Sequence, residues 1–418
     1  MKPVRTIALI LLMLTVFAIP WQDAIVLPGF GTVAKGLGIL TLLFTLASLA
    51  ENGALRLRPP SLVLVVTGLF VLWLMFSYYW SIDPQGSRSA VMQYLQLLAF
   101  VWVVWEICRS PAHLQAVAQA FVVGAYVSAI NILYIFLFVS HEIRIDGRIT
   151  SAGANQNDAA TMLAISLAFA WWLITKRRSF VLYVINVLFL PIGVAAILLT
   201  GSRGGTLEAT LALAAIPLTL TQLGTARRVL LLLFIAGLAV GVTQLPATYL
   251  QRATPDLQRV SGTANDLADQ NLSGRLGIWK GGMQALQARP VVGYGVEAFR
   301  AAVTPILGNG WAPHNTFLSI AVGTGLIGLA LFALILLVAA LPLFGVGSEG
   351  GVKVATLFVF LTLAVGLLPL GWEYNKVTWL VIAFVSAAHG HAVWPAGHRF
   401  GLRARYRPVP PARPGPDP

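Results

Sequence analysis

A histidine and three arginines are the residues of this sequence whose types and positions could act on a phosphate-bearing substrate. His314 stands next to Asn315 at the start of a long apolar stretch, and Arg148, Arg203 and Arg275 each adjoin a glycine. A guanidinium keeps its charge and binds phosphate oxygens through paired hydrogen bonds, whereas a neutral imidazole can accept a proton. Such a set could stabilise a departing diphosphate while the histidine deprotonates an acceptor hydroxyl.

The surroundings of His314 favour an uncharged imidazole. Pro313 ends the preceding segment, and a helix is expected from His314 to about Leu341, where Pro342 stops it. The positive end of a helix dipole disfavours protonation of a histidine placed there. The alternative is a histidine that only caps the helix by satisfying its free backbone N–H groups. The residue taken alone leaves both interpretations open.

The turn around Arg203 indicates an anion site. Residues 200–206 read Thr-Gly-Ser-Arg-Gly-Gly-Thr between two apolar runs. An arginine forced to the middle of a membrane costs roughly 2.5 to 3.5 kcal/mol, so one at its edge usually reaches the interface or pairs with an anion. The glycines let backbone N–H groups of the following helix approach the same ligand. The alternative partner of Arg203 is Glu208, and the turn lacks the Gly-Lys-Ser/Thr ending of a Walker loop.

The positions of Arg148 and Arg275 can also be explained without a bound phosphate. Arg148 precedes a Gly- and Asn-rich turn that could face an anion, or the loop 141–157 could simply lie near lipid headgroups. Arg275 begins a segment whose apolar residues recur at helical spacing, which predicts a short amphipathic helix on the membrane surface or across the mouth of the helix bundle. These apolar residues are Leu276, Trp279, Met283 and Leu286.

No metal site or cofactor is expected. No external pair of carboxylates has ligand spacing, so arginine rather than Mg²⁺ should meet the leaving-group charge. Cys108 is the only cysteine, which excludes disulfides and thiolate metal sites within the chain. Glu373 could support a base or pair with Lys376, and the pair is the preferred interpretation.

The composition indicates a polytopic membrane protein that positions these residues with helices. Of the 418 residues, 57% are hydrophobic and 10% are charged, far from the charged fraction of about 25% in soluble proteins. Apolar runs long enough to cross a bilayer predict about twelve transmembrane helices. They cover residues 6–21, 33–50, 61–80, 90–107, 114–140, 158–175, 180–200, 206–223, 229–246, 315–344, 354–370 and 377–393.

The charges predict the orientation of these spans. Most Lys and Arg residues fall on the side that holds both termini, and such residues are retained in the cytoplasm. The net charge of +13 therefore reflects the orientation of the spans in the membrane and does not indicate nucleic-acid binding. Arg148, Arg203, Arg275 and His314 then all face the outside. Trp73 and Trp80, near one end of the third span, are expected to belong to an interfacial aromatic belt.

Four regions follow from this topology. Residues 1–246 hold nine spans, residues 247–313 form one large external loop with short amphipathic helices, residues 314–395 hold three spans, and residues 396–418 are a basic cytoplasmic tail. A loop of this length is usually functional. The Pro- and Arg-rich tail is expected to lie against anionic lipid.

The spacing of several motifs resembles that of a known family. His314-Asn315, nine residues and then Gly325-Leu-Ile-Gly328 resembles a pattern of bacterial O-antigen ligases. The turn at 200–205, Gly-Arg at 274–275 with Trp279, and Gly-Tyr-Gly at 293–295 are similar to other landmarks of the O-antigen ligase and polymerase superfamily.

The resemblance implies a metal-independent, inverting glycosyltransferase of the membrane-embedded, GT-C-like type in the bacterial inner membrane, with a periplasmic site. The donor would be a polysaccharide on undecaprenyl diphosphate, and the acceptor a sugar hydroxyl of lipid A-core oligosaccharide in lipopolysaccharide synthesis. His314 would be the base, Arg203 and Arg275 would hold the diphosphate with Arg148 as an addition, and Asn315 would orient the imidazole.

Three other functions remain open. An O-antigen polymerase uses a second lipid-linked glycan as acceptor, and a protein O-oligosaccharyltransferase uses a serine or threonine hydroxyl. From another class, a lipid-linked glycan flippase would need polar residues through the bundle rather than at one face.

Overall fold

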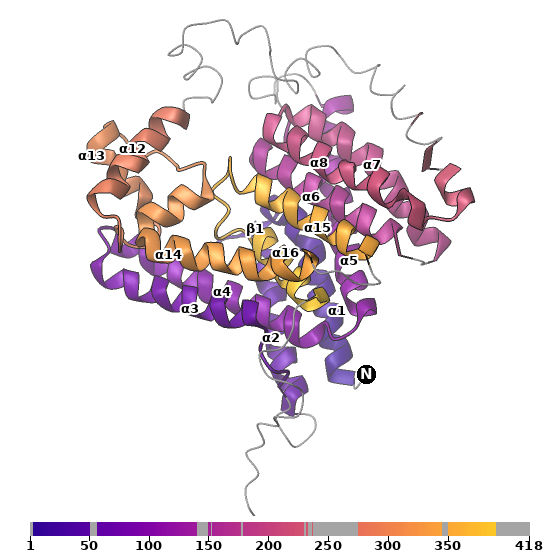
Figure 1. Cartoon of the computed structure of the whole chain (residues 1–418), viewed down its shortest axis with the longest axis horizontal. Coiled ribbons are helices and arrows are strands. Elements are labelled where there is room, and N and C mark those ends of the chain that lie inside the picture. Colours follow the sequence, from indigo (N-terminus) through magenta and orange to yellow (C-terminus); the bar gives the residue numbers. More distant parts are fainter. Residues whose placement is uncertain are drawn as a thin grey trace, which may run out of the picture.

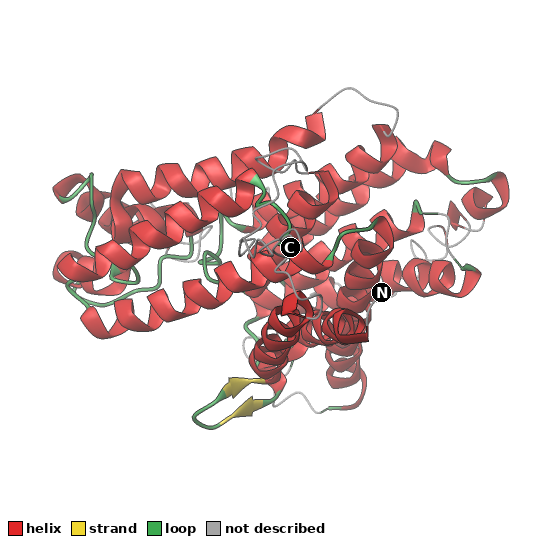
Figure 2. Cartoon of the chain, turned by 90° about the horizontal axis from the view of Figure 1, so that it is seen from below, coloured by secondary structure: helices red, strands yellow, loops and turns green. Residues whose placement is uncertain are grey.

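The computed structural model of the protein describes residues 3–50, 57–139, 149–151, 153–176, 179–229, 231–232, 236, 275–344 and 350–389. These residues form helices and their connecting loops, with one antiparallel pair of two-residue strands, β1 (Val26–Leu27) and β2 (Gly31–Thr32). Figure 2 shows this hairpin projecting from the helices. The predicted all-α fold is confirmed. Arg148, the first part of the predicted external loop and the tail 396–418 lie outside the described residues.

Eight helical segments in the described part of the chain are long and apolar enough to cross a membrane. They are α1 with η1 (Pro3–Ala24), α2 (Val33–Ala50), α3 with η2 (Leu62–Trp80), α4 (Pro84–Ile107), α5 (Pro111–Phe138), α6 (Gln156–Ile174), α7 (Phe180–Thr200) and α14 with η6 (Thr316–Phe344).

Three shorter helices occupy further predicted spans. They are α8 (Arg203–Thr219), which continues into η4 (Leu220–Gln222), α15 (Gly350–Gly366) and α16 (Lys376–His389). The predicted ninth span, 229–246, lies largely outside the described residues. The protein is therefore an all-α, multi-pass membrane protein.

Polar residues at the starts of the apolar runs explain where several helices begin. A side-chain oxygen of the residue before the helix accepts a backbone N–H of its first turn, which would otherwise lack a partner. The residues that do this are Ser61, Asp83, Ser110, Asn155, Ser202 and Asn315. Pro84 and Pro111 occupy the first helical positions of α4 and α5, where a missing N–H costs nothing.

Figure 1 shows α15 and α16 lying between two groups of helices. In one group, α3 packs on α4 and α14, and α12 (Arg275–Ala288) and α13 (Phe299–Leu307) pack against α14. In the other group, α6 packs on α5, α7, α8 and α15. Every residue of α6 from Ala159 to Ile174 is buried, so α6 is a central helix of the bundle. The helix α1 packs on α2 and α5.

An aromatic cluster joins α16 to three helices of the first group. The ring of Trp379 in α16 lies 6.3 Å from those of Phe70 in α3 and Tyr94 in α4, and 6.4 Å from that of Phe332 in α14. All four side chains are almost fully buried. Aromatic pairs at such separations add to the stability gained from burying the rings alone. The cluster therefore fixes α16 against α3, α4 and α14, from which the site described below is built.

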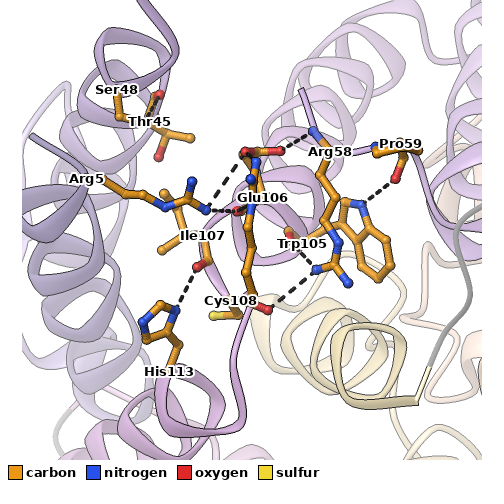
Figure 3. A network of polar contacts seen from close by, with 11 residues as sticks. Arg5, Thr45, Ser48, Arg58, Pro59, Trp105, Glu106, Ile107, Cys108 and His113 are labelled. Carbon is orange, nitrogen blue, oxygen red and sulfur yellow. Dashed lines mark hydrogen bonds and ion pairs between the residues drawn. The ribbon is translucent and has the colours of Figure 1, made fainter. Parts of the chain in front are cut away.

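One end of the bundle, which we call the Glu106 end, is held by a buried carboxylate among three arginines, of which Figure 3 labels Arg5 and Arg58. Glu106 is 1% exposed and is the last residue but one of α4. Its oxygens accept the backbone N–H of Arg58 at 2.9 Å and a guanidinium N–H of Arg109, and the guanidinium of Arg5 lies 4.0 Å away. The cluster thus ties α1 and the segment before α3 to the end of α4.

Candidate functional site

The helix that follows His314 is broken in its middle by Gly325. Gly325 has φ +71° and ψ −175°, which is outside the helical region and strained for any residue with a side chain. The break leaves carbonyl groups free on the preceding turn, because helical hydrogen bonds cannot form across it. A continuous helix was predicted over residues 315–344, so the break is a departure from the prediction.

The segment 290–295 fills this break with backbone hydrogen bonds. The N–H of Tyr294 donates to Val322 O at 3.0 Å, that of Gly295 to Gly323 O at 2.7 Å, and that of Leu326 to Pro290 O at 2.8 Å. A Cβ on Gly325 would lie 1.9 Å from Val291 O, so the close approach requires glycine. The Gly-Tyr-Gly motif and the first glycine of the Gly-x-x-Gly motif are thus two halves of one backbone contact.

Two tryptophans of α3 and η2 strengthen this contact. The indole N–H of Trp73 donates to Thr324 O at 2.9 Å, and that of Trp80 to Val292 O at 3.1 Å. The expected interfacial belt therefore has another role at these two positions, since each indole N–H is directed at the protein backbone.

The amphipathic helix predicted from Arg275 onward is present as α12 and packs across the start of α14. Its Gly282 faces Leu318 of α14 and Phe299 of α13, where a Cβ would lie 2.9 and 3.0 Å from their side chains. The indole N–H of Trp279 donates to Pro313 O at 3.0 Å. The contact fixes the residue directly before His314, so α12 positions the histidine.

His314 is not the residue that caps α14. Asn315 is, because its side-chain oxygen accepts the N–H of Leu318 at 2.9 Å. His314 lies one residue earlier with φ +43°, an uncommon conformation for a residue with a side chain. Among the described residues its imidazole has no hydrogen-bond partner. The capping interpretation of His314 is therefore wrong, and the side-chain oxygen of Asn315 bonds Leu318 and not the imidazole.

The electrostatic surroundings keep His314 neutral. Burial, and then the charges of Arg275 and Arg300, lower the pKa of the imidazole from its usual value of 6.5. The imidazole is half-buried and lacks a partner for its nitrogen, so it is available as a proton acceptor at neutral pH.

His314 lines a pocket of about 160 Å³ with side chains from three other parts of the chain. Carboxylates, hydroxyls and one guanidinium converge there although they are far apart in the sequence. The polar side chains are Asn155, Asn157 and Asp158 at the start of α6, Glu297 and Arg300 at the start of α13, Ser319 in α14, and Glu373 and Tyr374 before α16. We call this cavity the histidine pocket.

Glu373 is the most buried acid in the histidine pocket. The Ser319 hydroxyl donates to its Oε1, and its Oε2 has no hydrogen-bond partner in the described part of the chain. Burial raises the pKa of the Glu373 carboxyl to about 8. The expected pair with Lys376 is wrong, because the Lys376 ammonium group donates to Gln22 Oε1 at 2.6 Å instead.

Glu297 and Arg300 were not singled out from the sequence. Glu297 has φ +64°, and burial raises the pKa of its carboxyl while Arg300 opposes that rise. Arg300 is exposed, and its guanidinium donates to Gly310 O at 3.4 Å. The signal for both was the presence of two charges within five residues of the Gly-Tyr-Gly motif in a chain with few charges.

The structure places the three predicted arginines differently. Arg275 is near enough to His314 for its charge to lower the histidine pKa, although it does not line the pocket. Arg203 is the exposed first residue of α8, also outside the lining. Arg148 lies outside the described residues.

The start of α8 is nevertheless joined to the histidine pocket. Ser202, which caps α8 and precedes Arg203, donates its hydroxyl to Asn157 Oδ1 at 3.0 Å, and Asn157 lines the pocket. Glu208, the alternative partner of Arg203, instead accepts from the Thr161 hydroxyl at 3.1 Å and is buried. No salt bridge joins Arg203 to Glu208 in the described structure.

Metal ligands do not gather in the described residues, where no group of three or more His, Cys, Asp or Glu side chains could hold an ion. The metal-free reaction expected from the sequence stays a prediction.

Comparison with known proteins matches residues 187–333 to the O-antigen ligase family. The matched region runs from α7 to the second half of α14 and includes Arg203, Arg275 and His314. The chain is also 27% identical over 289 residues to the exopolysaccharide production protein ExoQ of Rhizobium meliloti (strain 1021). That match covers 65% of this chain and 63% of the relative, so it spans less than two thirds of the relative's length. The family resemblance inferred from the motifs is confirmed.

Proposed function

Because residues 187–333 match the O-antigen ligase family, we propose that the protein transfers a polysaccharide from undecaprenyl diphosphate to a sugar hydroxyl of lipid A-core oligosaccharide. The reaction is metal-independent and inverts the anomeric centre. The protein lies in the bacterial inner membrane with both termini in the cytoplasm and the histidine pocket at the periplasmic face. The observation that carries the proposal is the half-buried imidazole of His314, which has no hydrogen-bond partner among the described residues and lies in a pocket near Arg275 and Arg300, whose charges lower its pKa.

His314 acts as the general base in this reaction. Its free ring nitrogen takes the proton of the acceptor hydroxyl as that oxygen bonds to the anomeric carbon of the donor. The bond between this carbon and the diphosphate oxygen breaks, and the diphosphate leaves with the electron pair. Attack from the face opposite the leaving group inverts the anomeric configuration. General-base catalysis of this kind contributes about 10²- to 10⁴-fold to a rate.

The guanidinium groups near His314 stabilise the leaving group. The charges of Arg275 and Arg300 reach His314, and Arg203 directly follows Ser202, whose hydroxyl bonds Asn157 of the pocket. Charge-assisted hydrogen bonds to phosphate oxygens strengthen as negative charge develops on the diphosphate. Glu297 lines the same pocket, so its carboxyl lies on the wall that the imidazolium faces after proton transfer.

The donor role of the arginines predicts a loss of affinity in two variants. We expect Arg275→Ala and Arg203→Ala each to raise the Kd for a lipid diphosphate by about 10- to 100-fold, because each removes a hydrogen bond from a charged donor. Binding is measured with the purified protein in detergent. The control is Lys280→Ala, which removes an exposed cation of α12 outside the pocket. Unchanged affinity in both arginine variants, or an equal loss in the control, would contradict the diphosphate assignment.

The acceptor is tested by reconstitution. The purified protein is supplied with a lipid-linked glycan and, separately, with lipid A-core oligosaccharide, a second lipid-linked glycan or a serine- and threonine-rich protein, each with and without a chelator. We expect transfer to lipid A-core, unaffected by the chelator. Transfer only to a second lipid-linked glycan would make the protein a polymerase. The name of the exopolysaccharide relative favours this as the second candidate.

A further inference from the structure

A second cavity, separate from the histidine pocket, lies along α2 and α4. It has a volume of about 420 Å³ and a mainly apolar lining, to which Ile39, Leu42, Met92, Leu97, Phe100 and Val103 contribute. We call it the α2–α4 groove. Of the eight long apolar helices, α2 has the smallest share of its residues buried within the protein, 28%, so this side of the molecule has much apolar surface without a protein partner.

Two lysines stand at one end of the groove. Lys35 at the start of α2 and Lys376 at the start of α16 both line it. Neither ammonium group forms a salt bridge in the described structure, and that of Lys376 donates to the neutral side chain of Gln22. The negative charge of Asp23 acts on Lys376. Because one carboxylate stands against two ammonium groups, this end of the groove keeps an excess positive charge.

The lysine end of the groove adjoins the histidine pocket. Gln93, which lines the groove, donates its amide N–H to Tyr374 O at 3.4 Å, and the Tyr374 side chain lines the histidine pocket. Lys376 follows two residues later. The two cavities are therefore separated by the short segment before α16.

The length of the groove fits a hydrocarbon chain. Its lining residues on α4 run from Ser89 to Val103, which at 1.5 Å per residue is about 21 Å. This is shorter than the hydrocarbon core of a bilayer, about 30 Å, and longer than half of it. A chain that begins at the lysines thus lies within the membrane along most of its length.

We propose that the α2–α4 groove binds one acyl chain of an acidic phospholipid, whose phosphate is held by Lys35 and Lys376. The apolar walls hold the chain through van der Waals contacts that replace those with neighbouring lipid tails, and the two ammonium groups select a headgroup with net negative charge. A zwitterionic phospholipid brings its own cation to the same place and is disfavoured by it.

The bound lipid would connect α2 to the start of α16. Lys35 and Lys376 belong to helices that are far apart in the sequence, and a phosphate shared between them holds both ends in place. Because Tyr374 lies two residues before Lys376, the segment that lines the histidine pocket becomes more rigid when the lipid is present. This role is independent of the proposed glycan transfer, and its test uses no glycan.

The test measures lipid retention. The full-length protein is purified from nanodiscs of equal parts phosphatidylglycerol and phosphatidylcholine, and the lipids that remain bound are counted by native mass spectrometry. We expect the wild type to retain phosphatidylglycerol preferentially. The double variant Lys35→Gln/Lys376→Gln should lose about tenfold of that preference, because it removes both charged donors. Lys280→Ala, which removes an exposed lysine outside the groove, should keep it.

A second variant tests the groove without changing a charge. Gly38 lines the groove, and a Cβ there would meet only Thr15 Cγ2, at an ordinary distance of 3.8 Å. Gly38→Leu should therefore fold and fill the groove, so that the retained phosphatidylglycerol is lost. Gly68→Leu is the matched control, since Gly68 is a helical glycine of α3 with open space around it and does not line the groove.

The outcomes separate the alternatives. Equal retention of the two phospholipids by the wild type, or a preference that survives in the double lysine variant, would overturn the headgroup assignment. Retention unchanged by Gly38→Leu would overturn the assignment of the chain to the groove. Loss of lipid in Gly68→Leu as well would mean that the glycine substitutions act on the fold, and the lysine variant would then decide.

Discussion

Replacing His314 with alanine should stop glycan transfer while leaving the protein folded and able to bind its donor. The imidazole has no hydrogen-bond partner in the described structure, so its removal leaves no buried group unpaired and should cost little stability. The loss of a general base should lower kcat by about 10²- to 10⁴-fold. Transfer is measured in the reconstituted system, and donor binding and thermal unfolding are measured on the same preparation.

The matched control is a histidine at the other end of the bundle. His113 contacts Ile107 O through Nδ1 at 3.0 Å near Glu106, and His113→Ala should keep normal transfer. Normal turnover by His314→Ala would remove the base assignment. Failure of both variants to bind donor would point to a general loss of structure.

The pH dependence of transfer gives an independent measure of the same residue. The base must be neutral, and its pKa lies below 6.5, so kcat/KM should fall only as the pH drops below 6.5. Arg275→Gln removes one of the cations that lower this pKa, and the acid limb of the profile should move towards 6.5. An acid limb that stays in place would mean that His314 does not set it.

The largest expected effect on stability is at Glu106. Glu106→Gln keeps the shape of the side chain but removes the negative charge that pairs with the guanidinium groups of Arg5 and Arg109. Removing one partner of a buried ion pair costs roughly 3 to 5 kcal/mol, and the lower end is expected here because the Arg109 side chain is 38% exposed. The midpoint of thermal unfolding in detergent should fall clearly below that of the wild type.

A double variant distinguishes lost charge from lost packing at Glu106. Burial, and then the charges of Arg5 and Arg58, lower the pKa of Arg109 to about 10, so the guanidinium groups already repel one another in the wild type. Adding Arg109→Gln to Glu106→Gln removes one of the cations and should recover part of the lost stability. A double variant less stable than the single one would show that charge is not the cause.

The sequence was sufficient to predict the helices and the position of the histidine. Apolar runs of membrane-spanning length correspond to helices wherever the chain is described, and the helical spacing of Trp279 and its neighbours predicted α12. His314 was placed at the start of an apolar helix because Pro313 precedes it. These features depend on residues close together in the chain, where composition and periodicity are informative.

The features that the sequence did not predict depend on contacts between distant segments. The apolar run 315–344 continues through Gly325 without a charged residue or a proline that would mark a break. The conformation of Gly325 is set by the docked segment 290–295. Glu297 and Glu373 meet in one pocket although 76 residues separate them, and no periodicity records that. Arg5, Arg58 and Arg109 were interpreted only as indicating the orientation of the spans, because Glu106, whose carboxylate joins them, is close in sequence to Arg109 alone.

The way the segment 290–295 is attached to α14 bears on how this scaffold can diversify. The attachment uses main-chain groups, a few glycines and the indoles of Trp73 and Trp80, so on α12 and α13 it places demands only on the inward-facing side chains such as Trp279. Mutations on the outer surfaces of those two helices can therefore accumulate without moving His314. A single catalytic framework can in this way acquire new surfaces for sugars of different shape, as long as the glycines at the break are kept.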